Sequence, residues 1–160
     1  MNSALIKETN TRKLVISAAA GALYAVLTIV FAPISYGPLQ FRVSEALCVM
    51  PFFVPESAIR LFVGCILANL YTGNIFDIIF GSLATLTAGI LTAKAKKAWL
   101  ACLWPVVSNG LIVGAVLSFA YGIGIYPVCV LEVALCEAAV MYAVGLPMIK
   151  VFENKELFKK

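Results

Sequence analysis

Histidine is absent from this 160-residue chain, and charged residues make up only 12% of it. Without histidine, the Ser/His/Asp and Cys/His catalytic sets cannot form. Paired metal-ligand motifs and the G-x-x-x-x-G-K-[ST] phosphate loop are also missing. The five cysteines fall in apolar runs without C-x-x-C spacing, so we expect them to be small buried side chains. The sequence therefore predicts neither an enzyme nor a site for a metal or cofactor.

Apolar residues dominate the sequence. Hydrophobic residues make up 62% of the chain, and its mean hydropathy is +1.00. This composition lies outside the range of soluble proteins, and the length suits one domain, so we predict a single transmembrane domain over residues 1–160. The polar N-terminal stretch MNSALIKETNTRKL is not typical of a signal peptide, and we expect no cleavage. The net charge of +4 is spread over the ends and one loop, which argues against a nucleic-acid surface.

Charges, prolines and glycines divide the chain into six apolar segments, at about 14–34, 43–54, 57–72, 75–93, 98–121 and 126–151. A straight span needs about 20 apolar residues, and the second and third segments are shorter than that. Pro51 and Pro55 mark a break between these two. We predict an all-α integral membrane protein, a bundle of six transmembrane helices. Four spans with a re-entrant hairpin at 43–72 are the alternative.

Basic residues indicate which side of the membrane each loop faces. With both termini in the cytoplasm, every Lys and Arg except Arg42 lies on the inner side. The stretches YTGN and YGIGIYP, which would then be outer loops, carry no charge. The sequence therefore predicts a multi-pass membrane protein with both termini inside.

Polar side chains within the apolar segments are the candidates for function, because an ionisable group at membrane depth costs about 2.5–3.5 kcal/mol on insertion scales. Most of these groups lie in the outer half of their segments, which predicts a shared pocket open to the outside. The candidate substrate-binding residues are Arg42, Glu45, Asn69, Asp77, Trp104, Asn109, Glu132 and Glu137.

Several of these residues also fit structural roles. Arg42 and Glu45 stand at i and i+3, so they can pair with each other, with Arg42 orienting Glu45. Asp77 fits the first turn of a helix, where it would interact with the helix dipole. Glu132 and Glu137 lie about 140° apart on a helical wheel and do not share a face. Glu132 is nearer the outer surface and is predicted to be the water-exposed member, whereas Glu137 is the stronger candidate for function.

Small residues on the first segment form two adjacent rows, and such rows let helix backbones approach closely in lipid. One neighbour within the bundle needs only one row. We therefore predict that this face docks another membrane subunit, with internal packing as the alternative. The rows consist of Ser17, Ala18, Gly21, Ala22 and Ala25.

Four stretches carry a family resemblance: YGPLQFRVSEAL, FVGCILANL, DIIFGSLATLTAG and EAAVMYAVGLPM. In this order and spacing they resemble the queuosine-precursor transporter family, the QueT-type substrate-binding S components of energy-coupling factor (ECF) transporters. The resemblance covers nearly the whole chain. It implies a six-helix bundle with inner termini, a ligand pocket near the outer surface, and a first helix that docks a transmembrane scaffold, the T component, driven by two cytoplasmic ATPases. The matching polar motif residues are Arg42, Ser44, Glu45, Asn69, Asp77, Ser82 and Glu137.

The resemblance also implies a lid and a ligand. The loop between the first two helices would close the pocket, with Tyr36, Gly37, Pro38 and Phe41 as the gating residues. The ligand would be a 7-deazaguanine on the queuosine salvage route, such as preQ0, preQ1 or queuine. A carboxylate can accept two hydrogen bonds from a guanine-like edge, and Glu137 is our first choice for that contact, ahead of Asp77.

Other functions remain open from the residues alone. The chain fits a structural or assembly subunit of another membrane complex, with its acidic residues joining helices. It also fits a binding subunit for a different vitamin-like molecule. A carrier working alone, in which Asp77 and Glu137 exchange protons, is a third possibility, although no repeated halves are visible.

Overall fold

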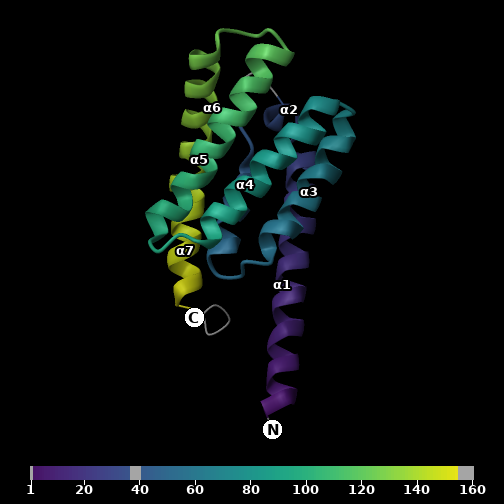
Figure 1. The fold of residues 1–160 in the computed structure, drawn as a ribbon, viewed down its shortest axis with the longest axis vertical. Coiled ribbons are helices and arrows are strands. Elements are labelled where there is room, and N and C mark those ends of the chain that lie inside the picture. The colour runs from purple at the N-terminus through teal and green to yellow at the C-terminus, as the bar shows by residue number, and fades with distance from the viewer. Residues whose placement is uncertain (1, 37–40, 155–160) are drawn as a thin grey trace.

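The structure is a computed structural model that describes residues 2–36 and 41–154. Within these ranges every element of secondary structure is a helix (Figure 1). In chain order the elements are α1 (Asn2–Val30), α2 (Ala32–Ser35), η1 (Val43–Phe52), α3 (Ser57–Thr72), η2 (Asp77–Gly81), α4 (Ser82–Ala93), α5 (Ala98–Ala115), η3 (Val116–Ala120), α6 (Tyr126–Val140), η4 (Met141–Gly145) and α7 (Leu146–Glu153). η1 is a 3₁₀ helix, and η2, η3 and η4 are π-helical turns that continue into or out of α-helices.

The long helices lie roughly along the long axis of the molecule, with α1 and α3 running the same way (Figure 1). In this view α1 and α3 rise, α4 descends, α5 rises, and α6 with α7 descends. The start of α1 and the end of α7 therefore lie toward the same end of the molecule, and the α5–α6 connection lies at the opposite end.

Helices coincide with all six apolar segments expected from the sequence. Three are long and apolar enough to cross a membrane: Thr11–Val30, Ala98–Ala120 and Tyr126–Glu153. The other three, Val43–Phe52, Ser57–Thr72 and Asp77–Ala93, are shorter apolar helices. The all-helical class is thus confirmed. Six crossings stay a prediction, because the shorter helices fall below the length of a straight span.

Glycines create the closest contacts between helices. A methyl group at Gly21 would overlap the Arg60 carbonyl, and one at Gly64 would overlap the Gly21 carbonyl, so α1 and α3 meet backbone to backbone. On the other side of the bundle, a methyl group at Gly114 would lie 2.9 Å from the Val130 Cα, so α5 and α6 also pack closely. Contacts of this kind hold helices together in lipid, where tight packing replaces the hydrophobic driving force.

The two small-residue rows on α1 have different environments. Ser17, Gly21 and Ala25 are buried within the molecule, and Gly21 lies against α3. Ala18 and Ala22 are exposed. The predicted docking face is therefore corrected: the buried row packs internally, because α3 needs its close approach, and only the exposed row is available to another protein.

The 3₁₀ helix η1 lies in the middle of the bundle, and every residue from Ser44 to Phe52 is buried. A 3₁₀ helix has three residues per turn, so side chains at i and i+3 lie on one line. Glu45 and Cys48 therefore point the same way. At the start of η1, the hydroxyl oxygens of Thr28 on α1 and Ser44 lie 2.6 Å apart, which ties η1 to the first helix.

Candidate functional site

Buried polar side chains gather between η1 and the helices around it. Buried hydroxyl, amide and charged groups come from α1, η1, α3, η2, α4, α5 and α6, and almost all of them find partners, as buried polar groups usually do. The residues are Thr28, Arg42, Ser44, Glu45, Asn69, Asp77, Ser82, Thr85, Ser108, Asn109 and Glu137. Polar side chains from distant segments thus share the interior of the bundle, and a single pocket open to the outside stays a prediction.

Glu45 is held by neutral donors from three elements. The Tyr24 hydroxyl on α1 donates to Glu45 Oε1. Cys48 Sγ lies 3.0 Å from Oε2, and Thr85 Oγ1 on α4 lies 3.5 Å from Oε1. Both carboxylate oxygens are thus engaged, and the side chain is only 1% exposed. Glu45 links α1, η1 and α4 from inside.

Arg42 precedes η1 in an extended backbone conformation and is 5% exposed. Its Nε donates to the Ser35 carbonyl at 3.4 Å, and its guanidinium carbon lies 5.0 Å from the centroid of the Tyr36 ring. Within residues 2–36 and 41–154, Arg42 forms no ion pair, and Nη2 has no hydrogen-bond partner. The expectation that Arg42 pairs with Glu45 is therefore wrong, because the extended backbone at Arg42 lies outside the helix that the i, i+3 rule assumes.

A small polar cavity lies next to these two residues. Arg42, Glu45, Asn109 and Glu137 line it together with Val113 and Val133. Its volume is about 10 Å³, which is room for roughly one water molecule. Glu137 is 4% exposed, and its Oε1 has no hydrogen-bond partner among the residues that the structure describes. The cavity thus combines one guanidinium, two carboxylates and an amide. Among these groups, Arg42 and Glu137 each have one polar atom without a partner in the described residues.

A second polar network lies at the end of α3. Asn69 Nδ2 donates to the Asp77 backbone carbonyl at 2.7 Å and to Ser82 Oγ at 3.3 Å. Asn69 Oδ1 accepts a hydrogen bond of 3.0 Å from the Tyr36 hydroxyl. Burial raises the pKa of Tyr36 to about 12, so the phenol stays protonated and able to donate.

Asp77 lies beside this network at the start of η2 and is 6% exposed. Its Oδ2 accepts a hydrogen bond of 2.9 Å from the Tyr121 hydroxyl, which comes from the connection between η3 and α6. Two tyrosines, from separate connections of the chain, thus fasten the polar groups at this end of the bundle.

Some predicted binding residues lie elsewhere. Trp104 packs with the apolar cluster around Val49, Cys102 and Met141, away from the polar cavity. Glu132 is exposed on α6, as its spacing from buried Glu137 predicts. Phe41 is exposed, and Gly37 and Pro38 lie outside the described residues.

Three residues of the site were not recognised from the sequence: Tyr24, Cys48 and Thr85. Tyr24 stands in a run of small residues, and a lone hydroxyl there was a usable signal. Cys48 is buried as predicted, but it also contacts a carboxylate oxygen of Glu45. The contacts of Tyr24 and Thr85 with Glu45 join residues 21 and 40 positions apart, so no local pattern could reveal them.

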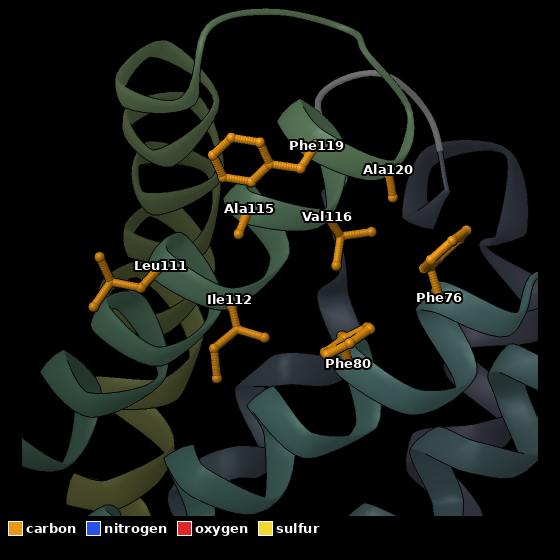
Figure 2. A pocket seen from close by; sticks show the side chains of 8 residues that line it. All are labelled: Phe76, Phe80, Leu111, Ile112, Ala115, Val116, Phe119 and Ala120. Atoms are coloured by element: carbon orange, nitrogen blue, oxygen red, sulfur yellow. The ribbon is translucent and has the colours of Figure 1, made fainter.

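A much larger pocket, of about 590 Å³, lies between the η2–α4 and α5–η3 segments (Figure 2). Its lining is wholly apolar, with three phenylalanines among its eight side chains. It offers a polar ligand no hydrogen-bonding side chain. We therefore place the candidate site at the small polar cavity, because its lining includes hydrogen-bonding side chains, although its volume is small.

The sequence model of the QueT transporter family matches residues 14–154. The chain belongs to this family. One relative of this QueT-family protein is the queuosine precursor transporter QueT of Lactococcus lactis subsp. cremoris (strain MG1363), which is 40% identical over 83 residues. That match covers 51% of this chain and 49% of the relative, so the two align over about half of each length. No solved structure matches the chain. Family membership and the long apolar helices together identify a multi-pass membrane protein.

Proposed function

We propose that this QueT-family protein is the substrate-binding subunit of an ECF importer for queuosine precursors. The observation that carries the proposal is the polar cavity, where buried Arg42 and Glu137 each keep an atom without a partner. Buried polar groups are normally paired, because an unpaired one loses the free energy of its hydration. A transporter-family protein that keeps such groups free at one cavity is arranged to bind a polar ligand.

The ligand class follows from the groups around the cavity. Carboxylate, amide and guanidinium groups suit a flat heterocycle with several N–H donors and carbonyl acceptors. The 7-deazaguanines preQ0, preQ1 and queuine have this pattern. Glu137 offers carboxyl oxygens that accept hydrogen bonds from the N–H groups of the heterocycle. Asn109, which lines the same cavity, satisfies a remaining donor or acceptor.

Calorimetric titration of the detergent-purified protein with preQ0 and preQ1 tests this function. We expect binding by the unmutated protein and a loss of about 1.5–3 kcal/mol in Glu137→Gln, which replaces a charged acceptor by an amide. Glu132→Gln, on the exposed face of the same helix, is the matched control and should bind normally. Failure of the unmutated protein to bind any deazaguanine would reject the substrate class and favour an assembly subunit.

Tyr36 and Phe41 are the described residues of the proposed lid. Tyr36 connects the first helix to the polar interior, because it contacts both Arg42 and Asn69. Breaking these two contacts frees the chain before η1. We propose that this step admits the ligand from the outer side.

Two cytoplasmic ATPases drive the importer through a transmembrane scaffold, the T component, which docks on the exposed row of α1. Ala18 and Ala22 leave space there for close helix approach. Ala22→Leu should abolish uptake by cells and leave ligand binding to the isolated subunit intact. Equal loss of both would show that the row is needed for the fold itself.

The proposed topology has six spans with both termini in the cytoplasm. Single-cysteine labelling tests it in a variant whose native cysteines are replaced, with Ser at position 48 to keep a donor for Glu45. Ile123→Cys should react only from outside, and Lys96→Cys only from inside. The opposite pattern would exclude this orientation.

A further inference from the structure

We propose that Arg42 and Glu137 together recognise a lactam edge, in which a ring carbonyl stands next to a ring N–H. The carbonyl oxygen accepts a hydrogen bond from Arg42 Nη2, and the adjacent N–H donates to Glu137 Oε1. This inference rests on the function proposed above. It gives Arg42 a contact with the ligand in place of the expected contact with Glu45.

The first support is the pair of free atoms. Arg42 and Glu137 are 5% and 4% exposed, and across residues 2–36 and 41–154 neither Nη2 nor Oε1 has a hydrogen-bond partner. A guanidinium nitrogen can only donate, and an ionised carboxylate oxygen can only accept. The cavity that both residues line therefore offers one donor and one acceptor to a bound molecule.

The second support is the way Arg42 is held. The Ser35 carbonyl and the Tyr36 ring engage Nε and the guanidinium group. These contacts fix the planar head of the side chain while Nη2 stays free. A guanidinium fixed in this way presents its remaining N–H groups in a defined direction, as recognition of one particular carbonyl requires.

The third support is the surroundings of Glu137. Glu45 lines the same cavity, but Tyr24, Cys48 and Thr85 already engage its two oxygens. Glu137 is thus the carboxylate with an oxygen to spare for an incoming N–H. The cavity holds only about 10 Å³, so a heterocycle must displace the Val113 and Val133 walls before both contacts form.

The arrangement predicts a specific discrimination. An amino–ring-nitrogen edge, as in a 6-aminopurine, exchanges the donor and the acceptor of a lactam. Such a ligand would place an N–H against Arg42 and a lone pair against Glu137. Sites built from buried hydrogen-bonding groups reject mismatched ligands strongly, and for two mismatches we expect a factor of at least about 100 in affinity.

The test compares two probes, 7-deazaguanine and 2,6-diamino-7-deazapurine, which differ only at this edge. Calorimetric titration of the full-length purified protein should show at least about 100-fold preference for 7-deazaguanine. Arg42→Met should reduce the preference below about tenfold, because one of the two reading groups is lost. Arg42→Lys, which keeps a charged donor, should retain part of the preference, and Glu132→Gln should retain all of it.

Melting temperatures establish that each variant is folded. If Arg42→Met does not fold, Glu137→Gln carries the test, since its amide can both donate and accept and should also weaken the preference. Full preference in folded Arg42 and Glu137 variants would overturn the inference and leave the proposed function standing. Binding of neither probe by the unmutated protein would reject the proposed function itself.

A water-bridged ion pair between Arg42 and Glu137 is the competing explanation. In that case each single variant lowers the melting temperature, the double variant Arg42→Met with Glu137→Gln is no less stable than either, and the preference between the probes is unchanged. That combination of results would also overturn the inference.

Discussion

The polar interior has two sides that differ in how their hydrogen bonds are satisfied. Around Glu45, donors from α1, η1 and α4 engage both carboxylate oxygens. Around Glu137, on α6, one carboxylate oxygen has no partner among the described residues, although the side chain is almost as deeply buried. Burial alone therefore does not separate a structural carboxylate from a recognition group. The number of carboxylate oxygens that have hydrogen-bond partners differs between the two, and on this basis we propose a structural role for Glu45 and a ligand contact for Glu137.

The largest effect on the Glu45 side should come from the helix contact that supports it. Gly21→Leu places a side chain where α3 leaves no space for a methyl group. We expect the free energy of unfolding to fall by more than about 4 kcal/mol, or folding to fail, because backbone atoms must move. Thermal unfolding in detergent measures this. Ala22→Leu, one position along on the exposed row, is the control and should unfold normally.

The next effect compares the two carboxylates directly. Glu45→Gln turns an acceptor into an amide donor that faces the donors around it, and should lower the free energy of unfolding by about 2–3 kcal/mol. Glu137→Gln in the ligand-free protein should change it by less than about 1 kcal/mol, because no partner of Oε1 is lost. Equal losses in thermal unfolding would erase the distinction between the two sides.

A smaller effect isolates one donor to Glu45. Thr85→Val keeps the shape of the side chain and removes its hydroxyl, which contacts Glu45 Oε1 and the Gly81 carbonyl. We expect a loss of about 1 kcal/mol in thermal unfolding. Ligand affinity should stay unchanged, and a large drop in affinity would instead place Thr85 among the ligand contacts.

The smallest effect should appear at the contact between Tyr36 and Asn69. Tyr36→Phe removes the hydrogen bond to Asn69 Oδ1 and keeps the ring beside Arg42. A loss of about 0.5–1 kcal/mol is expected, together with faster ligand release in stopped-flow measurements if this contact fastens the lid. Unchanged release rates would show that Tyr36 does not limit exit.

The sequence predicted the helical segments and most of the buried polar residues, because both are visible in local patterns. Long apolar runs locate the helices, and charged or amide residues inside such runs usually face the protein interior rather than lipid. The spacing of Glu132 and Glu137 predicted that they face different environments, and the structure confirms it.

The partners of these residues could not be predicted, because they depend on tertiary packing. The i, i+3 rule failed for Arg42 since its backbone is extended at φ −99° and ψ 100°, directly before η1. The docking face was overestimated for a similar reason. Two adjacent small rows look alike in sequence, and only the position of α3 shows that one of them is already covered.

The π-helical turn η4 makes the orientation of Glu137 depend on the number of residues in the last helical segment. Buried positions recur at every fourth residue through α6, η4 and α7, at Cys129, Val133, Glu137, Met141, Gly145 and Ile149. In a regular α-helix a four-residue spacing drifts by about 40° per step, which would turn the later positions toward the surface. The π-helical turn accommodates about one extra residue, and this returns the later positions to the buried face. Deletion of a single exposed residue there, such as Ala143, would change no buried side chain, yet it would rotate Glu137 by about 100° relative to α7. The number of residues in this segment thus determines the direction in which the Glu137 carboxylate points.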